Sequence, residues 1–272
     1  MQQLSLKPVL GVLGNVTSVA LFLSPLPTLW SIYKLKSTQE FSSLPYVCTL
    51  FNCALWLLYG TPYVKPNSII ILTTNGIGFI LEFFYLLCYM AFASRKKKIK
   101  TMWLTMAMCV ALATVVVVTI VAVHTHSGRQ LVAGTACVVL SVAMYASPLS
   151  VIGIVISSKS VECMPFLLSL FNLINALVWT AYSVFAKDIF VAIPNGTGSL
   201  FGIFQVGLYV VYRNSTKLSS KSTQLTETKT TEVAATECSS DKVQENLVGP
   251  TKASSQRFLS PQKVLPTAES LV

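Results

Sequence analysis

The sequence predicts an all-α membrane protein in which seven transmembrane helices form two parallel three-helix bundles joined by a linker helix (3+1+3). Three observations carry this prediction. Hydrophobic residues make up 53% of the 272 residues and charged residues only 11%, whereas a soluble domain has about 25% charged residues. The apolar residues fall into seven runs with few or no charges, and one unit of the chain occurs twice.

The repeated unit is marked by two copies of an Asn-Gly-x-Gly sequence, each near the start of an apolar run. The copies begin at Asn75 and Asn195, 120 positions apart, and Pro45 and Pro165 precede them by 30 positions each. Farther toward the N-terminus the spacing shifts by three, because the matching Ser-Pro-Leu sequences begin at residues 24 and 147. An internal repeat of this length indicates that one structural unit is present twice.

Each apolar run is close to the ~20 residues that cross a bilayer as a helix. The runs cover residues 9–29, 44–63, 69–93, 102–123, 131–156, 165–185 and 191–212. The first run does not resemble a signal peptide, because one lysine precedes it and no cleavage site of small residues follows.

The fourth run, 102–123, is rich in Val and has no counterpart in the repeat. A three-helix unit ends on the side of the membrane opposite to where it began. One additional crossing therefore restores the orientation, and the two copies become parallel, related by an axis along the membrane normal.

The cationic residues between the runs predict the orientation. One set of alternate loops carries most of the cations, and the other set carries few. The first set holds Lys34, Lys36, the cluster at residues 95–100, Lys159, Arg213 and Lys217, and the second holds Lys7, Lys65, Arg129 and Lys187. By the positive-inside rule the first side is cytosolic. We therefore expect the N-terminus outside and the C-terminus in the cytosol, in the plasma membrane or, as the alternative, the vacuolar membrane.

Four segments follow from this organisation. They are a first three-helix repeat (1–93), a basic loop with the linker helix (94–127), a second repeat (128–213) and a tail (214–272). The tail is rich in Ser, Thr, Lys, Gln and Glu and is expected to be disordered in the cytosol. The net charge of +10 lies in loops and tail, so it indicates topology and not a nucleic-acid partner.

Four prolines occupy corresponding positions in the two copies, near the predicted cytosolic ends of the first, second, fifth and sixth runs. They are Pro25, Pro45, Pro148 and Pro165. Proline removes a backbone donor and disfavours a straight helix. A proline that only begins a membrane helix is the simpler explanation for any one of them, but the two-fold pattern favours hinges that let one unit rock against the other.

Asn75 and Asn195 lie a few residues inside the third and seventh runs. An amide in hydrocarbon needs a partner, and contact between helices is one possibility. Because the pseudo-symmetry places these two residues opposite each other between the units, a shared ligand is the alternative that we favour.

Two Asn–Trp pairs have i,i+4 spacing, which puts both members on one helix face. They are Asn52 with Trp56 in the second run and Asn175 with Trp179 in the sixth. An amide beside an indole suits a sugar, since the amide meets hydroxyls and the ring covers the apolar C–H face. The strict repeat offset pairs Trp179 with Tyr59, so we expect the two Asn–Trp pairs to be only approximately symmetric.

Glu82 is the one acid well inside a run, and it could be a proton site or a hydrogen-bonded structural residue, which we favour. His124 and His126 are weak evidence for a metal. The sequence shows no phosphate-binding loop, zinc signature or catalytic triad pattern. We therefore expect no enzyme activity, no cofactor and no metal.

The sequence resembles the SWEET sugar transporters of plants and animals over about residues 8–213. The resemblance rests on Lys36-Ser37-Thr38, Leu44-Pro45-Tyr46, Met144-Tyr145-Ala146-Ser147-Pro148-Leu149, Lys159-Ser160-Val161-Glu162, Met164-Pro165-Phe166 and Pro194-Asn195-Gly196. Parallel repeats are a known feature of this family. The resemblance implies passive uniport by homo-oligomers. It also implies that Asn75, Asn195 and Trp179 bind sugar, that the four prolines form a tetrad, and that Tyr59 and Asp188 form an outer gate.

The resemblance also bears on selectivity. The positions that set pocket width in similar plant members are Leu21, Asn52, Met144 and Asn175, all of them bulky here, which is the monosaccharide pattern. The repeat relates Leu21 to Met144, so we expect these two to face each other at the pocket floor. Cys163 departs from the family pattern, which usually has Phe there to help close the inner gate.

Three alternatives to a hexose uniporter remain open. A sucrose-transporting member would need a wider pocket. A proton-coupled carrier of small solutes would need Glu82 to titrate. A seven-helix receptor would match the number of spans, but the internal duplication argues against it.

Overall fold

The computed structural model describes residues 6–161 and 164–213, and every regular element in these ranges is a helix. The helices are α1 (Leu6–Phe22), α2 (Leu26–Leu35), α3 (Leu44–Gly60), α4 (Ile69–Phe92), α5 (Arg95–Val117) with a π-helical end η1 (Val118–Ala122), α6 (His126–Ala143), α7 (Ala146–Ser158), α8 (Phe166–Ala186) and a final helix, Ile189–Arg213. The predicted tail and Cys163 lie outside the described residues.

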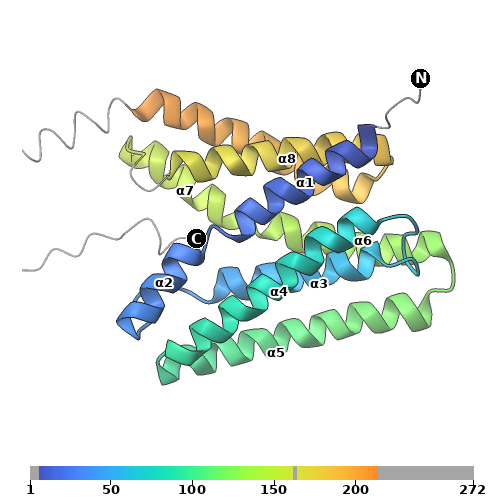
Figure 1. The fold of residues 1–272 in the computed structure, drawn as a ribbon, viewed down its shortest axis with the longest axis horizontal. Helices are drawn as coiled ribbons and strands as arrows, with labels where there is room; N and C mark the ends of the chain where they lie inside the picture. The colour runs from blue at the N-terminus through green and yellow to red at the C-terminus, as the bar shows by residue number, and fades with distance from the viewer. Residues whose placement is uncertain (1–5, 162–163, 214–272) are drawn as a thin grey trace, which may run out of the picture.

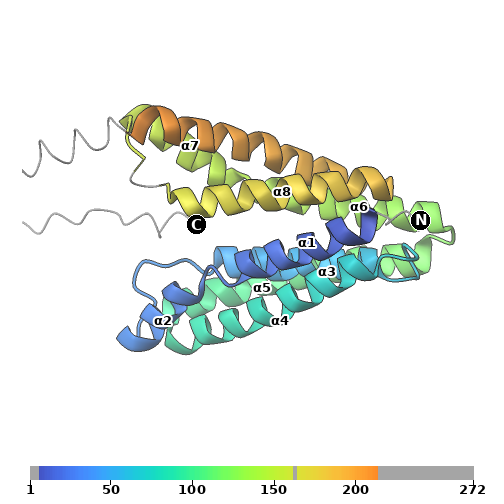
Figure 2. The ribbon, with the colours of Figure 1, turned by 45° about the horizontal axis from the view of Figure 1, so that its top comes forward.

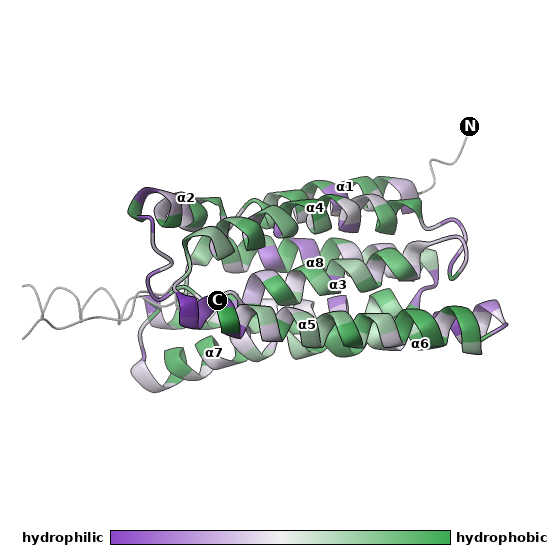
Figure 3. Ribbon diagram, turned by 90° about the horizontal axis from the view of Figure 1, so that it is seen from below, coloured by the Kyte–Doolittle hydropathy of each residue, from purple (hydrophilic) through white to green (hydrophobic). Residues whose placement is uncertain are grey.

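Seven apolar crossings result, as predicted. Six helical spans are long and apolar enough to cross a membrane, and α3 is a shorter apolar helix of 17 residues. Two of the six spans are pairs of shorter helices, α1 with α2 and α6 with α7. Figure 3 shows hydrophobic residues along the helices and hydrophilic residues mainly at the ends and in the connections.

The breaks in the two long spans occur at the predicted prolines. Between α1 and α2, the carbonyl of Leu21 accepts a hydrogen bond from the backbone N–H of Ser24 at 3.0 Å, because Pro25 has no N–H to offer it. Pro148 lies in the first turn of α7, just after the corresponding break. Pro45 lies in the first turn of α3, and Pro165 is the N-cap of α8. These two prolines begin helices, and the hinge role of all four stays a prediction.

The helices of the two repeats meet in two matching pairs. Helix α1 of the first repeat packs on α8 of the second, and α6 of the second packs on α3 of the first. In each pair the first helix of one repeat contacts the second helix of the other. Figures 1 and 2 show the second-repeat elements α7, α8 and the final helix grouped together, away from α2, α4 and α5.

The linker helix α5 belongs spatially to the first repeat. It packs along α3, and the hydroxyls of Ser43 and Thr101 form a buried hydrogen bond of 2.7 Å between the start of α3 and α5. Helix α4 ends at Phe92 and α6 begins at His126, close to the expected limits of the linker segment. The division into domains remains a prediction.

The two ends of the bundle differ in charge. We call the end at which α5 begins the basic end, because Arg95, Lys96 and Lys100 are exposed there; it lies at the left in Figure 1. The opposite end is called the Asp188 end, after the buried acid that precedes the final helix.

Candidate functional site

A cavity of about 250 Å³ lies between the two repeats and takes its walls from both of them. Its lining residues are Ser18, Phe22, Asn52, Trp56, Ile71, Thr74, Asn75, Ser141, Met144, Tyr145, Asn175, Trp179, Val191, Pro194 and Asn195. Seven of the eight predicted substrate-contacting residues are therefore brought together: Asn52, Trp56, Asn75, Met144, Asn175, Trp179 and Asn195. Their contact with a ligand stays a prediction.

The eighth predicted residue, Leu21, does not line this cavity. It borders a separate hollow with Leu167 and Phe171 of α8. Phe22, the next residue along the chain, faces the cavity in its place. The expectation that Leu21 and Met144 face each other at the pocket floor is thus not met in this structure. Ser18 and Phe22 are four residues apart on α1 and share the face that lines the cavity, whereas Leu21 lies on a different face of the same helix.

The second glycine of each Asn-Gly-x-Gly sequence makes room for an aromatic ring from the first span of the same repeat. A Cβ atom on Gly78 would lie 2.5 Å from the ring of Phe22, and one on Gly198 would collide with the hydroxyl of Tyr145. The Tyr145 hydroxyl also donates a hydrogen bond of 2.7 Å to the carbonyl of Pro194. The repeated glycines therefore let these aromatic side chains reach the cavity wall.

Asn75 and Asn195 have the same local geometry. Each amide Nδ2 donates a hydrogen bond of 2.8 Å to the carbonyl four residues earlier in its helix, that of Ile71 for Asn75 and that of Val191 for Asn195. Each bond uses one N–H and fixes the amide against its own helix. The Oδ1 atoms have no hydrogen-bond partner among the described residues, so each asparagine can offer a carbonyl oxygen to a ligand.

Asn175 and Trp179 form a hydrogen-bonded cluster with Ser18, which joins α8 to α1. The indole Nε1 of Trp179 donates to Ser18 Oγ at 3.0 Å, and Ser18 Oγ donates to Asn175 Oδ1 at 2.9 Å. Gly14, one turn before Ser18, lets the indole lie against α1, since a Cβ there would be 2.9 Å from the ring.

Asn52 and Trp56 form the matching cluster with Ser141, which joins α3 to α6. Trp56 Nε1 donates to Ser141 Oγ at 3.3 Å, and Ser141 Oγ donates to Asn52 Oδ1 at 2.8 Å. This correspondence corrects the strict pairing of Trp179 with Tyr59. Within α3 and α8 the cavity residues correspond at a spacing of 123, so that Trp56 is the counterpart of Trp179.

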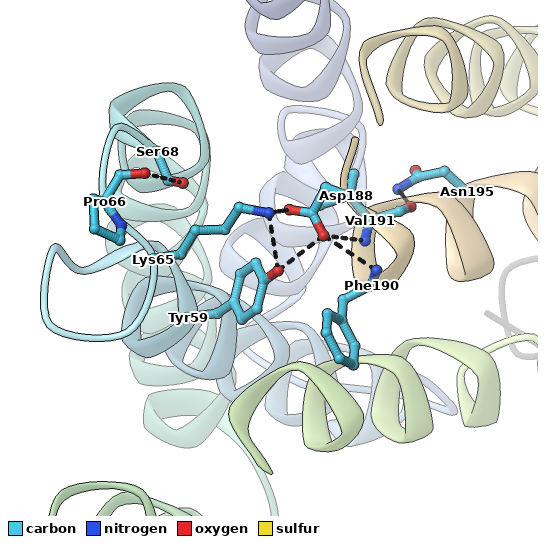
Figure 4. Close-up of polar contacts among 8 residues, drawn as sticks. All are labelled: Tyr59, Lys65, Pro66, Ser68, Asp188, Phe190, Val191 and Asn195. Atoms are coloured by element: carbon cyan, nitrogen blue, oxygen red, sulfur yellow. Dashed lines mark hydrogen bonds and ion pairs between the residues drawn. The ribbon is translucent and has the colours of Figure 1, made fainter. Parts of the chain in front are cut away.

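A polar network lies at the Asp188 end of the bundle, next to the cavity residue Val191, and Figure 4 shows its contacts. The hydroxyl of Tyr59 donates a hydrogen bond of 2.8 Å to Asp188 Oδ1, and Lys65 forms an ion pair with Asp188 Oδ2. Asp188 Oδ1 also accepts from the backbone N–H groups of Phe190 at 3.1 Å and Val191 at 3.4 Å. Asp188 therefore caps the final helix and at the same time ties it to the first repeat.

The sequence analysis did not identify Lys65 as a partner of Asp188, although it placed Lys65 in one of the connections that carry few charges. Its side chain is only 19% exposed and that of Asp188 only 1%. A buried carboxylate without a cation is strongly unfavourable. Lys65 and Asp188 both lie in the connections that carry few charges, so Lys65 was one of four candidate cations, although the sequence does not specify which of them pairs with Asp188.

Glu82 does not line the cavity. It is 4% exposed inside the first repeat, and its Oε2 atom has no hydrogen-bond partner within the described ranges. The expectation of a hydrogen-bonded structural acid is therefore not met for this oxygen. The residues that the structure describes contain no cluster of three or more His, Cys, Asp or Glu side chains able to hold a metal.

Comparison with known proteins relates this architecture to one family. A family model described as a sugar efflux transporter for intercellular exchange matches residues 8–97 and 131–217, one stretch in each predicted repeat. The chain is 42% identical over 221 residues to the bidirectional sugar transporter SWEET7b of Oryza sativa subsp. japonica, which covers 81% of this chain and 83% of that protein. It is 43% identical over 213 residues to the bidirectional sugar transporter SWEET7 of Arabidopsis thaliana, with 78% and 83% covered.

A solved structure agrees with this relationship. The 3.7 Å structure of a eukaryotic SWEET transporter is similar with a TM-score of 0.73 and 36% identity, covering 76% of this chain and 97% of that one. The twofold match to one family model, the identity over most of the chain and the common 3+1+3 fold show that this chain belongs to the SWEET family of sugar transporters, which are not enzymes.

Proposed function

We propose that the chain is a passive, bidirectional uniporter of monosaccharides that works by alternating access. The observation that carries the proposal is the central cavity, in which four asparagine amides and two indoles from both repeats surround one space. Amides suit sugar hydroxyls, and indole rings suit the C–H face of a sugar ring. Family membership supports the same substrate class.

The size of the cavity supports a monosaccharide over a disaccharide. Its volume of about 250 Å³ lies below the ~300–1,000 Å³ of typical ligand pockets. The bulky side chains of Asn52, Met144 and Asn175 line its wall. One hexose ring fits such a space more readily than two linked rings.

The network at the Asp188 end supports alternating access. Contacts among Tyr59, Lys65 and Asp188 join the two repeats at that end, as expected for a state closed on one side. In the other state this network must open, because a solute cannot pass while the ion pair joins the two repeats. The proline breaks in the first and fifth spans are suited to such rocking.

Three further features belong to the proposal. The N-terminus and the Asp188 end face outward and the basic end faces the cytosol, as the cation distribution favours. The plasma membrane is the proposed location, with the vacuolar membrane as the alternative. We also propose that the protein works as a homo-oligomer, as the family resemblance implies.

Uptake of radiolabelled glucose, fructose and sucrose in a yeast that lacks its own hexose transporters tests this function. We expect hexose uptake and efflux that both follow the gradient and that a protonophore leaves unchanged. Sucrose flux equal to glucose flux would contradict the size argument. Accumulation above equilibrium that a protonophore abolishes would favour the proton-coupled alternative.

A further inference from the structure

The two serines at the centre of the cavity clusters determine which atoms of the neighbouring amides are free. An indole N–H can only donate a hydrogen bond, so Ser18 and Ser141 accept from Trp179 and Trp56. A serine hydroxyl has one proton. That proton points to the amide of Asn175 or Asn52, at 2.9 Å and 2.8 Å. The atom that receives it must be the amide oxygen.

This arrangement fixes the rotation of both amides. With Oδ1 bound to the serine, the NH₂ group is the part of Asn52 or Asn175 that remains for a ligand. In the first cluster Thr17 adds a second hydrogen bond of 2.7 Å to the same oxygen of Asn175. Neither Nδ2 atom has a hydrogen-bond partner among the described residues. The indole N–H groups are already used, so the two tryptophans present only their rings.

The other two amides of the cavity have the opposite arrangement. Asn75 and Asn195 each direct an N–H to a carbonyl of their own helix, which leaves the carbonyl oxygen free. The cavity therefore has N–H donors on α3 and α8, and carbonyl acceptors on α4 and the final helix. Because the same division occurs in both repeats, it does not depend on the details of one helix pair.

We propose that Ser18 and Ser141 are positioning residues that orient Asn175 and Asn52 so that these amides donate to substrate hydroxyls. In this arrangement Asn75 and Asn195 accept from other hydroxyls. The inference rests on the proposed function, because it concerns how the same cavity recognises a sugar. It adds that recognition requires hydroxyls of two kinds, one set that accepts and one set that donates.

Deoxy and deoxyfluoro analogues of glucose distinguish the two kinds of hydroxyl. Fluorine can accept a hydrogen bond but cannot donate one, and a deoxy position does neither. A hydroxyl that meets the N–H groups of Asn52 or Asn175 should therefore tolerate fluorine but not hydrogen. A hydroxyl that donates to Asn75 or Asn195 should tolerate neither replacement.

The experiment is competition of each analogue pair, at positions 2, 3, 4 and 6, against labelled glucose uptake. For the unmodified protein we expect at least one position where the fluoro sugar competes nearly as well as glucose and the deoxy sugar is about tenfold weaker, the equivalent of about one hydrogen bond. In Ser141→Ala the amide of Asn52 is free to rotate, and in Ser18→Ala combined with Thr17→Val that of Asn175 is, because Thr17 alone would still hold the Asn175 oxygen. There we expect a glucose KM up to about tenfold higher and little remaining difference between fluoro and deoxy sugars.

Two further variants separate positioning from a general structural effect. Ser141→Thr keeps the hydroxyl and should keep the fluorine preference. Ser150→Ala is a matched control, because Ser150 is exposed on α7 and its one hydrogen bond within the described residues is to the carbonyl of Ala146 in its own helix, at 2.9 Å. Variants that fail to reach the cell surface are compared by the same competition on purified protein. Because Ser141 is less buried than Ser18, the variants at Ser141 provide an independent test.

The outcomes separate the two proposals. If the unmodified protein transports no hexose, the proposed function fails. If it transports glucose but shows no fluorine-tolerant position, or if Ser141→Ala and the double variant both keep that pattern, only the positioning role is overturned. Behaviour of Ser141→Thr identical to that of Ser141→Ala would also contradict it.

Discussion

The two repeats contribute almost identical parts to the cavity and different parts to its closure. Each supplies one Ser, one Asn–Trp pair and one Asn from an Asn-Gly-x-Gly sequence. At the Asp188 end the first repeat provides Tyr59 and Lys65 and the second provides Asp188. Tyr182, the counterpart of Tyr59 at the spacing of 123, packs its ring on Trp179 as Tyr59 does on Trp56. No hydrogen bond of its hydroxyl is present in the described part of the chain.

This difference shows which property the duplication preserved. A sugar ring can be gripped from two sides by similar groups, so symmetry suits binding. An ion pair needs unlike charges, so one repeat must supply the cation and the other the anion. The residue that precedes the third helix of each repeat illustrates the divergence. It is Ser68 before α4 in the first repeat and Asp188 before the final helix in the second.

The largest expected effect comes from removing one of the symmetric amides. Asn75→Ala or Asn195→Ala should abolish or nearly abolish transport with normal surface abundance. Each amide offers about two hydrogen bonds of up to about 1.5 kcal/mol each, so the loss reaches about 150-fold. Labelled hexose uptake, normalised to surface protein, measures it. Near-normal uptake in both variants would show that the cavity is not a shared site.

Breaking the asymmetric closure should have the next largest effect. Lys65→Met leaves the buried carboxylate of Asp188 without its cation, which destabilises the state closed at that end. We expect transport to fall about tenfold, less than for a fully buried pair because Lys65 keeps some solvent contact. A cysteine introduced at Val191 should react faster with an impermeant thiol reagent in this background.

Lys187→Met provides the matched control for the closure. Lys187 is adjacent to Asp188 in sequence, but it is exposed and takes no part in the network of Figure 4. Equal reactivity at position 191 in the two lysine variants would indicate that the ion pair does not hold the closed state.

Enlarging the cavity by shortening side chains that line it in both repeats should change the selectivity between sugars. Asn52→Ser, Met144→Val and Asn175→Ser together should raise the ratio of sucrose to glucose flux by about tenfold and weaken glucose affinity, because a second ring needs added volume. Since Leu21 lies outside the cavity, adding Leu21→Val should bring no further gain. If the quadruple variant had a much higher ratio of sucrose to glucose flux than the triple variant, Leu21 would line the pathway in another state.

The two tyrosines give a smaller and more specific test. Tyr59→Phe removes one hydrogen bond to Asp188 and should lower transport by about fivefold, the effect of about 1 kcal/mol. Tyr182→Phe should leave transport unchanged, although the same atom is removed from the corresponding helix. If the two variants lowered uptake equally, the hydroxyls of Tyr59 and Tyr182 would contribute equally to closure, contrary to the contacts in this structure.

The smallest effect is expected at Glu82. Glu82→Gln keeps the size of a side chain that does not touch the cavity, so flux should continue down the gradient in either direction. Uptake with and without an imposed pH gradient checks this. A pH-driven accumulation that Glu82→Gln removes would assign the acid to proton coupling.

Seven crossings, the duplication and the parallel arrangement followed from the sequence alone. A bilayer demands helices of about 20 apolar residues with their backbone groups satisfied internally, so composition and length are sufficient to locate them. The candidate residues at i,i+4 spacing, such as Asn175 and Trp179, were equally accessible, because spacing determines which side chains share a helix face.

Tertiary structure alone decided which faces meet. A shift of three residues rotates a position by about 300°, nearly a full turn, so spacings of 120 and 123 place residues on almost the same face. Only the packing of α1 on α8 and of α6 on α3 made Trp56, and not Tyr59, the counterpart of Trp179. Leu21 likewise lies on a face of α1 away from the cavity, which Ser18 and Phe22 of the same helix line. The pairing of Lys65 with Asp188 required two loops, far apart in sequence, to meet in space, which no local pattern specifies.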